Sequence, residues 1–331
     1  MVNDLTFYIL VDFKDGPWGG GNQFLKGLRF ELQARNNWAD TADKADVILF
    51  NSHHKLEEVV RFRRDFPNKM FLHRVDGPMA YRGKAGVRLD RKIFRTNQII
   101  ADGTIFQSHW SRSQSYLNGM KKNTYEAVIH NAPDPTIFHP GHKDKPLSHK
   151  DRKTRLIACS WSASQEKGFD IYHFLDQNLD YDRYQMTFVG RVDRPFQNIR
   201  MVGPLDPVNL ARELRSHDLF IFASKLEACS NSLLEALHCG LPAVVRIGSS
   251  NQEITRDNAI RFRESADVLE KIDTAIQQLV GRNRPIGLDT ISDVCAKYMQ
   301  FANRIHKIGQ FGTHQNRTLG FVANFRLRYG I

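Results

Sequence analysis

The chain has 331 residues, about twice the usual length of one domain, so two domains are favoured over one. Apolar residues make up 41% of it and charged residues 25%, which is usual for a folded globular protein and excludes a disordered or fibrous chain. The formal net charge of +11 favours anionic partners, such as nucleotide diphosphates, anionic lipid or nucleic acid, and does not choose among them.

The first apolar run of the chain is short and lies between Asp4 and Asp12. It is typical of a first strand and not of a signal peptide. No later stretch reaches the roughly 18 uncharged apolar residues that a membrane-spanning helix needs. These features predict a cytoplasmic protein.

Short apolar runs alternate with helical stretches through the first half of the chain, which is the pattern of a parallel sheet covered by helices. The predicted strands are residues 5–11, 46–51, 69–74, 98–107 and 125–130. The predicted helices are residues 23–33, 55–64, 86–95 and 111–117. After Asn131 come prolines and then a charge-dense stretch with almost nothing to bury, so we expect a domain boundary near residue 145.

The same pattern restarts in the second half, before a helical tract near residues 288–308 and a basic tail. Its predicted strands are residues 155–159, 185–189, 199–202, 218–222 and 242–245. Two doubly wound halves of this kind predict a cleft between domains, with ligands bound on the loops that follow the carboxyl ends of the strands.

The most informative segment is residues 218–245. Its buried strand ends in a polar loop, and then Ser230, Asn231 and Ser232 supply cap residues for a helix that Gly240 closes. The exposed amides and the dipole at the amino end of such a helix favour a phosphate group.

Two carboxylates flank this helix end. Glu227 lies in the loop and Glu235 lies one turn into the helix, so they can accept hydrogen bonds from sugar and ribose hydroxyls on either side of a diphosphate. The alternative is a solvated loop carboxylate and a glutamate on an outer helix face.

These two glutamates, with the Gly-Leu-Pro ending that follows, resemble the signature of retaining GT-B glycosyltransferases of family 4, also called group 1 glycosyltransferases. Three further segments agree with the resemblance in the same order along the chain: the glycines Gly19 to Gly21, residues 128–134 (VIHNAPD) and residues 164–170 (SQEKGFD). The resemblance implies a GT-B fold of two Rossmann-like doubly wound domains that face a central cleft. It also implies transfer of a sugar from a nucleotide diphosphate sugar to a hydroxyl of a glycan or lipid-linked acceptor, with retention of configuration. The nucleotide sugar would be a co-substrate, and no metal or other cofactor is implied.

The resemblance also assigns roles to residues of the second half. Lys167 would pair with the donor phosphates, Glu227 would hold the transferred sugar and Glu235 would bind the ribose. The family usually has an arginine six residues before the lysine, where this chain has Trp161, so we predict that Arg191 replaces it. Gly203 would lie against the base through its backbone. The amides of Ser230, Asn231 and Ser232 would hold the diphosphate.

The first half contributes candidates for the acceptor side. Gly20 and Gly21 let the backbone approach a ligand, near the acceptor or the diphosphate. His73 and Asp76 follow one another at the end of a predicted strand. The resemblance implies that His73 lies beside the transferred sugar, and Asp76 could accept the proton of the incoming hydroxyl. The alternatives are a satisfied core histidine and an aspartate that only fixes the Asp-Gly-Pro turn.

A positive face is predicted in the first half, at helical spacings of three and four. It could contact an anionic membrane at the inner face or guide a charged acceptor, and the alternative is a solvated helix face. Its residues are Lys84, Arg88, Arg91, Lys92 and Arg95.

The domain prediction is therefore an acceptor domain at residues 1–145, a donor domain at residues 146–308 and a tail at residues 309–331 that packs back on the first domain. The rival functions are a nucleotide-sugar epimerase, a phosphorylase, or a basic protein that binds nucleic acid or membrane. Nucleic acid is not expected, because the basic face lacks interleaved aromatic residues and a recognised binding module.

Overall fold

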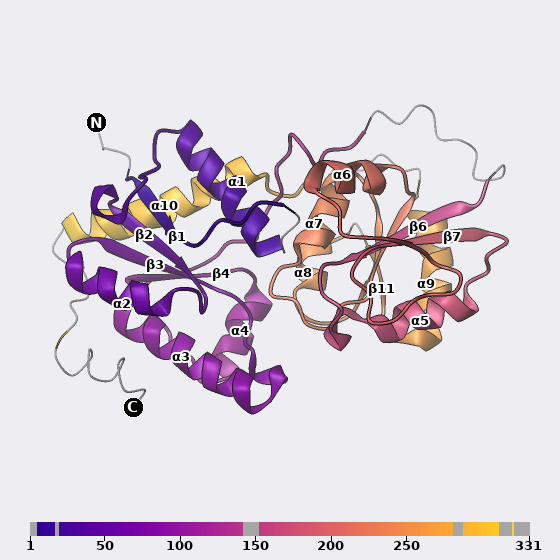
Figure 1. The fold of residues 1–331 in the computed structure, drawn as a ribbon, viewed down its shortest axis with the longest axis horizontal. Coiled ribbons are helices and arrows are strands. Elements are labelled where there is room, and N and C mark those ends of the chain that lie inside the picture. The colour runs from indigo at the N-terminus through magenta and orange to yellow at the C-terminus, as the bar shows by residue number, and fades with distance from the viewer. Residues whose placement is uncertain are drawn as a thin grey trace. The chain divides into compact units, whose positions relative to one another are not determined.

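The computed structural model describes residues 5–16, 20–141, 152–257, 259–280, 287–310 and residue 320. These residues divide into two compact units. The first comprises the chain up to Phe13, Leu25–His130 and the part from Ile291 onward, and the second comprises Lys14–Phe24 and Asn131–Thr290. Each unit is a parallel sheet covered by helices, which confirms the predicted fold class (Figure 1).

The first unit holds a five-stranded parallel sheet in the order β1-β2-β3-β4-β5. Its strands are β1 (Phe7–Leu10), β2 (Val47–Asn51), β3 (Met70–Val75), β4 (Gly103–Phe106) and β5 (Glu126–Val128). Every residue of β2 and β3 is buried, as expected for inner strands with helices on both faces. The helices are α1 (Gly20–Ala34), α2 (Leu56–Asp65), α3 (Lys84–Ile100), α4 (His109–Leu117) and α10 (Ile291–Gln310). The start of α1, up to Phe24, belongs to the second unit.

Helix α10 lies on the first unit, whereas we predicted that the second domain runs to residue 308. A Cβ atom at Gly103, where β4 begins, would lie 2.7 Å from the side chain of Ile305 and 3.0 Å from that of Phe301. The helix therefore packs directly on this sheet, beside α1 (Figure 1). Of the predicted tail, residues 311–319 and 321–331 lie outside the described residues.

The second unit holds a six-stranded parallel sheet in the order β11-β10-β9-β6-β7-β8. Its strands are β6 (Thr154–Ser160), β7 (Tyr184–Gly190), β8 (Arg200–Val202), β9 (Leu219–Phe222), β10 (Ala243–Arg246) and β11 (Ala259–Phe262). The helices are α5 (Phe169–Asn178), α6 (Pro207–Arg215), α7 (Asn231–His238), α8 (Asn251–Thr255) and α9 (Ser265–Gln278). The predicted boundary at residue 145 differs from the observed division, because Phe138 is already buried in the core of this second unit.

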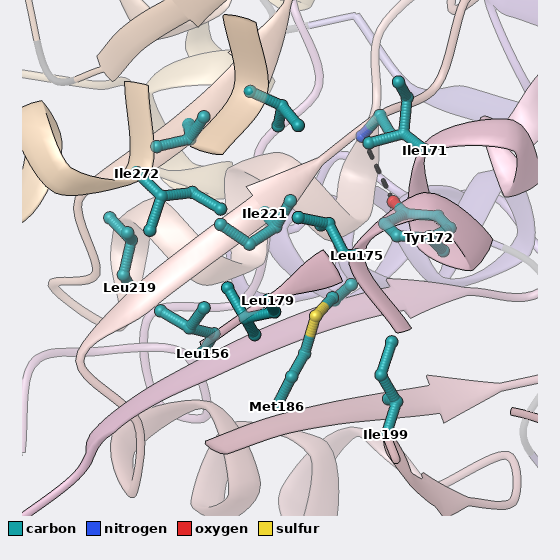
Figure 2. Packing of buried hydrophobic residues seen from close by; sticks show 14 of the residues in the cluster. Leu156, Ile171, Tyr172, Leu175, Leu179, Met186, Ile199, Leu219, Ile221 and Ile272 are labelled. Atoms are coloured by element: carbon teal, nitrogen blue, oxygen red, sulfur yellow. Dashed lines mark hydrogen bonds between the residues drawn. The ribbon is translucent and has the colours of Figure 1, made fainter. Parts of the chain in front are cut away.

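Alternate residues of the second sheet point to opposite faces, and both faces are apolar. Leu156 belongs to the core shared with α5 and α9, whereas Ile157 belongs to the core shared with α6 and α7. Figure 2 shows the first of these cores, where the hydroxyl of Tyr172 accepts a hydrogen bond of 3.1 Å from the N–H of Ala223. This bond fixes the end of β9, which is followed by the loop of residues 224–230 (the site loop).

None of the helices in the described part of the chain combines the length and the hydropathy that a membrane crossing requires.

Candidate functional site

The carboxyl ends of the parallel strands lie along one edge of the second sheet, and the loops at this edge carry most of the predicted site residues. Trp161 and Lys167 follow β6, Arg191 follows β7, and the loop from Ser224 to Ser230 follows β9. Because β6 pairs with both β7 and β9, the three loops leave from neighbouring strands.

A tight turn holds Lys167 against the end of β9. Gly168 closes the turn with a φ of +84°. A Cβ atom at this position would lie 2.1 Å from the backbone oxygen of Ala223, so the turn can approach the strand this closely only with glycine. The N–H of Lys225 donates to the carbonyl of Glu166 at 2.8 Å and ties the site loop to the turn.

Lys167 forms an ion pair with Glu227, with 2.6 Å between Nζ and Oε1. The hydroxyl of Ser224 lies 2.7 Å from the same carboxylate oxygen. The lysine side chain is 29% exposed and the glutamate 15%, so the pair is partly withdrawn from water and still reachable. An ammonium group has three N–H bonds, and one bond to Glu227 leaves two for a ligand.

Helix α7 begins at the end of this loop, as predicted. The hydroxyl of Ser230 caps it by accepting a hydrogen bond from the N–H of Leu233. The backbone N–H groups of Asn231 and Ser232 have no acceptor among the described residues. Two donors and the positive end of the helix dipole are thus available to an anion.

Asn131 and Gly20 lie against this helix end. The amide of Asn131 donates to Oδ1 of Asn231 at 3.0 Å. A Cβ atom at Gly20 would lie 2.3 Å from Nδ2 of Asn231, so this glycine approaches the helix end closely. The predicted approach of its backbone to a ligand stays a prediction. Gly21 is exposed and a Cβ atom there would meet nothing within 4 Å, and Gly19 lies outside the described residues.

Glu235 is a partly buried carboxyl group with no hydrogen-bond or ion-pair partner among the described residues. Burial raises its pKa to about 7. It lies one turn into α7, on the helix whose amino end has the two available N–H groups. A carboxylate in this position can accept hydrogen bonds that the protein itself does not supply.

Arg191 and Trp161 lie side by side at the ends of β7 and β6. The guanidinium carbon of Arg191 is 4.7 Å from the centroid of the Trp161 ring. Arg191 is exposed. Gly203, after β8, is also exposed, and a Cβ atom there would meet nothing within 4 Å.

In the first unit, His73 is fully buried in β3 and both of its ring nitrogens have partners. Nε2 lies 3.0 Å from the carbonyl oxygen of Ser52, and Nδ1 lies 3.0 Å from the amide nitrogen of Asn97. The ring stacks on Phe50 with 4.2 Å between centroids. Burial lowers the pKa of His73 to about 4, so the ring is neutral at pH 7. The predicted contact with a sugar would require the ring to exchange these partners.

Asp76 follows β3 and lies at the surface end of a polar network. Its Oδ1 accepts hydrogen bonds from Arg74 at 3.2 Å and from the amide of Gln107. Its backbone carbonyl accepts a bond of 3.2 Å from the hydroxyl of Ser111. The carboxylate is 25% exposed, so it bonds to Arg74 and can still reach a solute.

The predicted basic face lies on helix α3. Four of its five residues are exposed and the fifth is partly buried: Lys84, Arg88, Arg91 and Lys92, then Arg95.

Sequence reasoning missed Ser224 as a contributor to the site and did not predict the contact that Gly168 makes. Ser224 comes two residues after the end of a buried strand, and a polar residue at that place was the available signal. The contact of Gly168 with Ala223 joins segments more than fifty residues apart and has no local signal. Among the described residues, no group of three or more His, Cys, Asp or Glu side chains is arranged to hold a metal ion.

Residues 173–281 match a family model described as glycosyl transferases group 1. A curated relative is the uncharacterized protein 356 of Sulfolobus islandicus rod-shaped virus 1, which is 24% identical over 232 residues. That match covers 62% of this chain and 63% of the viral protein, so the chain spans less than two thirds of its relative.

Solved structures are similar over most of the chain. HepE of Anabaena, in complex with UDP-glucose, is 14% identical, has a TM-score of 0.64 and matches over 98% of each chain. Sucrose-phosphate synthase of Thermosynechococcus elongatus is 14% identical, with a TM-score of 0.59 over 92% of this chain and 84% of that one. The α,α-trehalose-phosphate synthase of Burkholderia xenovorans, in complex with glucose-6-phosphate, is 10% identical, with a TM-score of 0.57 over 85% and 77%. At these identities the likeness shows the GT-B fold alone; the match of residues 173–281 supports a group 1 glycosyltransferase.

Proposed function

We propose that this chain is a retaining, metal-independent glycosyltransferase of family 4 that moves a hexosyl group from a nucleotide diphosphate sugar to an acceptor hydroxyl. The observation that carries the proposal is the ion pair of Lys167 and Glu227, at 2.6 Å, in the loops beside the amino end of α7. A cation, carboxylates and free helix amides are the groups that a nucleotide diphosphate sugar requires, since its central diphosphate is anionic and the sugar and ribose on either side of it are rich in hydroxyls.

In the proposed reaction the bond between the anomeric carbon and the diphosphate oxygen breaks, and its electron pair stays on that oxygen. The acceptor oxygen forms the new bond on the same face of the sugar and loses its proton. Lys167 and the N–H groups of Asn231 and Ser232 stabilise the charge that develops on the departing diphosphate. This stabilisation is greater in the transition state than in the bound donor, which is how it accelerates the reaction.

The carboxylates are proposed to orient the two ends of the donor. Glu227 accepts hydrogen bonds from hydroxyls of the transferred sugar, and Ser224 and Lys167 hold it in place at 2.7 and 2.6 Å. Glu235 accepts from the ribose, which gives a partner to a carboxyl group that otherwise has none among the described residues. Gly203 is proposed to lie against the base. The roles of His73 and Asp76, in the first unit, stay predictions.

UDP-glucose is the first donor to test, because HepE was solved with it. A glycan or a lipid-linked sugar is proposed as the acceptor. The exposed basic face of α3, together with Tyr81 and Val87, which are 45% and 38% exposed near its start, supports peripheral contact with an anionic membrane.

The test is transfer from labelled nucleotide sugars to an acceptor panel of soluble glycans and lipid-linked glycans in anionic vesicles. Lys167→Ala is expected to lower kcat roughly 100-fold, because one charged donor to the leaving group is lost. Nuclear magnetic resonance of the product reports the anomeric configuration. Lys271→Ala is the matched control, since it removes a lysine that pairs with Glu270 on α9.

An inverted product would overturn retention alone. An epimerised donor without transfer would assign the site to a different reaction. If the wild type neither transfers nor binds any nucleotide sugar, or if Lys167→Ala and Lys271→Ala behave alike, the proposed donor site is wrong.

A further inference from the structure

The carboxyl edge of the second sheet holds a cation that is fixed by an aromatic ring. The guanidinium of Arg191 lies over Trp161, 4.7 Å from the ring centroid. The two residues directly follow Gly190 and Ser160, which are partners in the register of β7 and β6. Trp161 and Arg191 are therefore the next pair along two adjacent strands, and their side chains leave the sheet side by side.

The backbone holds these strand ends together tightly. The N–H of Arg191 donates to the carbonyl of Ser160 at 3.0 Å. Gly190 has a φ of +119°, and a Cβ atom there would lie 1.9 Å from the same carbonyl oxygen. The close approach fixes where the side chains of Arg191 and Trp161 begin, so the strand pairing places them next to one another.

Arg191 differs from three other cations along this edge. Arg246 and Lys225 pair with Asp170 at 2.9 and 3.4 Å, and Lys167 pairs with Glu227. Arg191 has no carboxylate partner among the described residues. A ring orients a guanidinium without neutralising its charge, and its N–H groups still point outward in the plane of the fork.

We propose that Trp161 is a positioning residue that holds Arg191 as the second cation for the donor diphosphate, beside Lys167. This assignment rests on the proposed function, because the ligand of Arg191 would be the nucleotide sugar proposed there. A planar guanidinium held in one orientation loses little conformational freedom when it binds phosphate oxygens in pairs. A carboxylate partner would instead neutralise the charge that attracts the phosphate.

A rival role for Trp161 is direct stacking on the nucleotide base. The two roles differ in how substitutions combine. If Trp161 acts only through Arg191, its substitution weakens nucleotide affinity only while Arg191 is present. If Trp161 contacts the base directly, its substitution weakens affinity equally with and without Arg191.

The experiment is a double-substitution cycle, with binding of UDP, GDP and ADP measured by calorimetry for the wild type, Trp161→Ala, Arg191→Ala and the double variant. For the nucleotide that the wild type binds, Arg191→Ala is expected to weaken affinity roughly 10-fold or more, as for loss of a charged hydrogen bond. Trp161→Ala is expected to weaken it roughly 2- to 5-fold, the size of an exposed cation–π contact, and Trp161→Phe to restore most of the loss. The double variant is expected to match Arg191→Ala.

Arg183→Ala is the matched control, since Arg183 lies over Tyr184 at 4.9 Å at the opposite end of β7 and is expected to leave binding unchanged. Thermal unfolding of each variant checks that it is folded. If Trp161→Ala does not fold, Trp161→Phe takes its place in the cycle. The assignment is overturned if Arg191→Ala binds like the wild type, or if the losses of the two single variants multiply in the double variant. If Lys167→Ala loses binding while Arg191→Ala does not, the proposed function stands and this assignment alone is wrong. If the folded wild type binds none of the three nucleotides, the proposed function is wrong and this assignment falls with it.

Discussion

At the scale of one residue, Glu235 carries a cost in stability that no partner among the described residues offsets. Its carboxyl group is partly buried without a partner among the described residues, and burial raises its pKa to about 7 from an ordinary 4.5. The protein therefore holds a carboxyl group that ionises only at a cost in free energy near pH 7.

This cost predicts a pH-dependent stability. Because the folded pKa lies above the unfolded one, the protonated group stabilises the fold fully below pH 4.5, and that contribution is lost as pH rises through 7. Relative to Glu235→Gln, the free energy of unfolding of the wild type should fall by roughly 1–3 kcal/mol between pH 5 and pH 8. Urea unfolding of both proteins across this range measures the difference.

The comparison with the glutamine variant is needed because His73 acts in the opposite direction. Its pKa is lowered to about 4, so the stability it contributes is lost as pH falls below the ordinary 6.5. Both proteins share His73, and its effect cancels in the difference. Parallel stability curves for wild type and variant would show that Glu235 is ionised without cost.

The sequence predicted the second-unit residues of the site because the cap residues and both glutamates lie in one local segment. Other features depend on contacts between distant segments. The full burial of His73 depends on Ser52 and Asn97, which approach it from other elements. Spacing along the chain identifies neighbours on one element and does not identify partners across a sheet.

At the scale of elements, the turn before α5 is the part of the site most sensitive to one methyl group. Gly168 has a φ of +84°, and its place against Ala223 sets the position of Lys167. Gly168→Ala should lower the free energy of unfolding by roughly 2–4 kcal/mol, because the left-handed conformation and a contact of 2.1 Å with a backbone oxygen both oppose a Cβ atom. Urea unfolding measures the loss.

Gly240→Ala separates the two causes. Gly240 has nearly the same φ, +81°, but a Cβ atom there would meet Pro140 at an ordinary 3.4 Å. It should therefore cost only about 1 kcal/mol, the conformational part. Equal losses in the two variants would mean that a Cβ atom at residue 168 does not make the clash with the backbone oxygen of Ala223 that the distance of 2.1 Å predicts.

Most elements could be predicted because inner strands of parallel sheets are continuous apolar runs and the helices between them are amphipathic. The prediction failed where this contrast is weak. We predicted a strand at residues 98–107, but α3 continues to Ile100 and β4 begins at Gly103, because the last helical turn is as apolar as the strand that follows. The edge strand β11 was not predicted, since only one of its four residues is buried.

At the scale of the whole molecule, α10 shows what periodicity leaves open. Its apolar face predicted a helix near residues 288–308, but an apolar face does not indicate which core will cover it. The structure groups it with the first unit, where Phe301 and Ile305 pack on the sheet at Gly103. The first unit thus includes a helix that follows the second unit in the sequence.

This arrangement predicts that damage to α10 acts on the first unit. Phe301→Ala and Ile305→Ala should each lower its stability by about 2–5 kcal/mol, as expected for large side chains removed from a core. Gln300→Ala, at an exposed position of the same helix, should change stability by less than about 0.5 kcal/mol. Hydrogen exchange followed by mass spectrometry should show lost protection in β3 and β4 and unchanged protection in β6 and β9. Lost protection in the second sheet, with the first intact, would assign α10 to the second unit, as its place in the sequence had indicated.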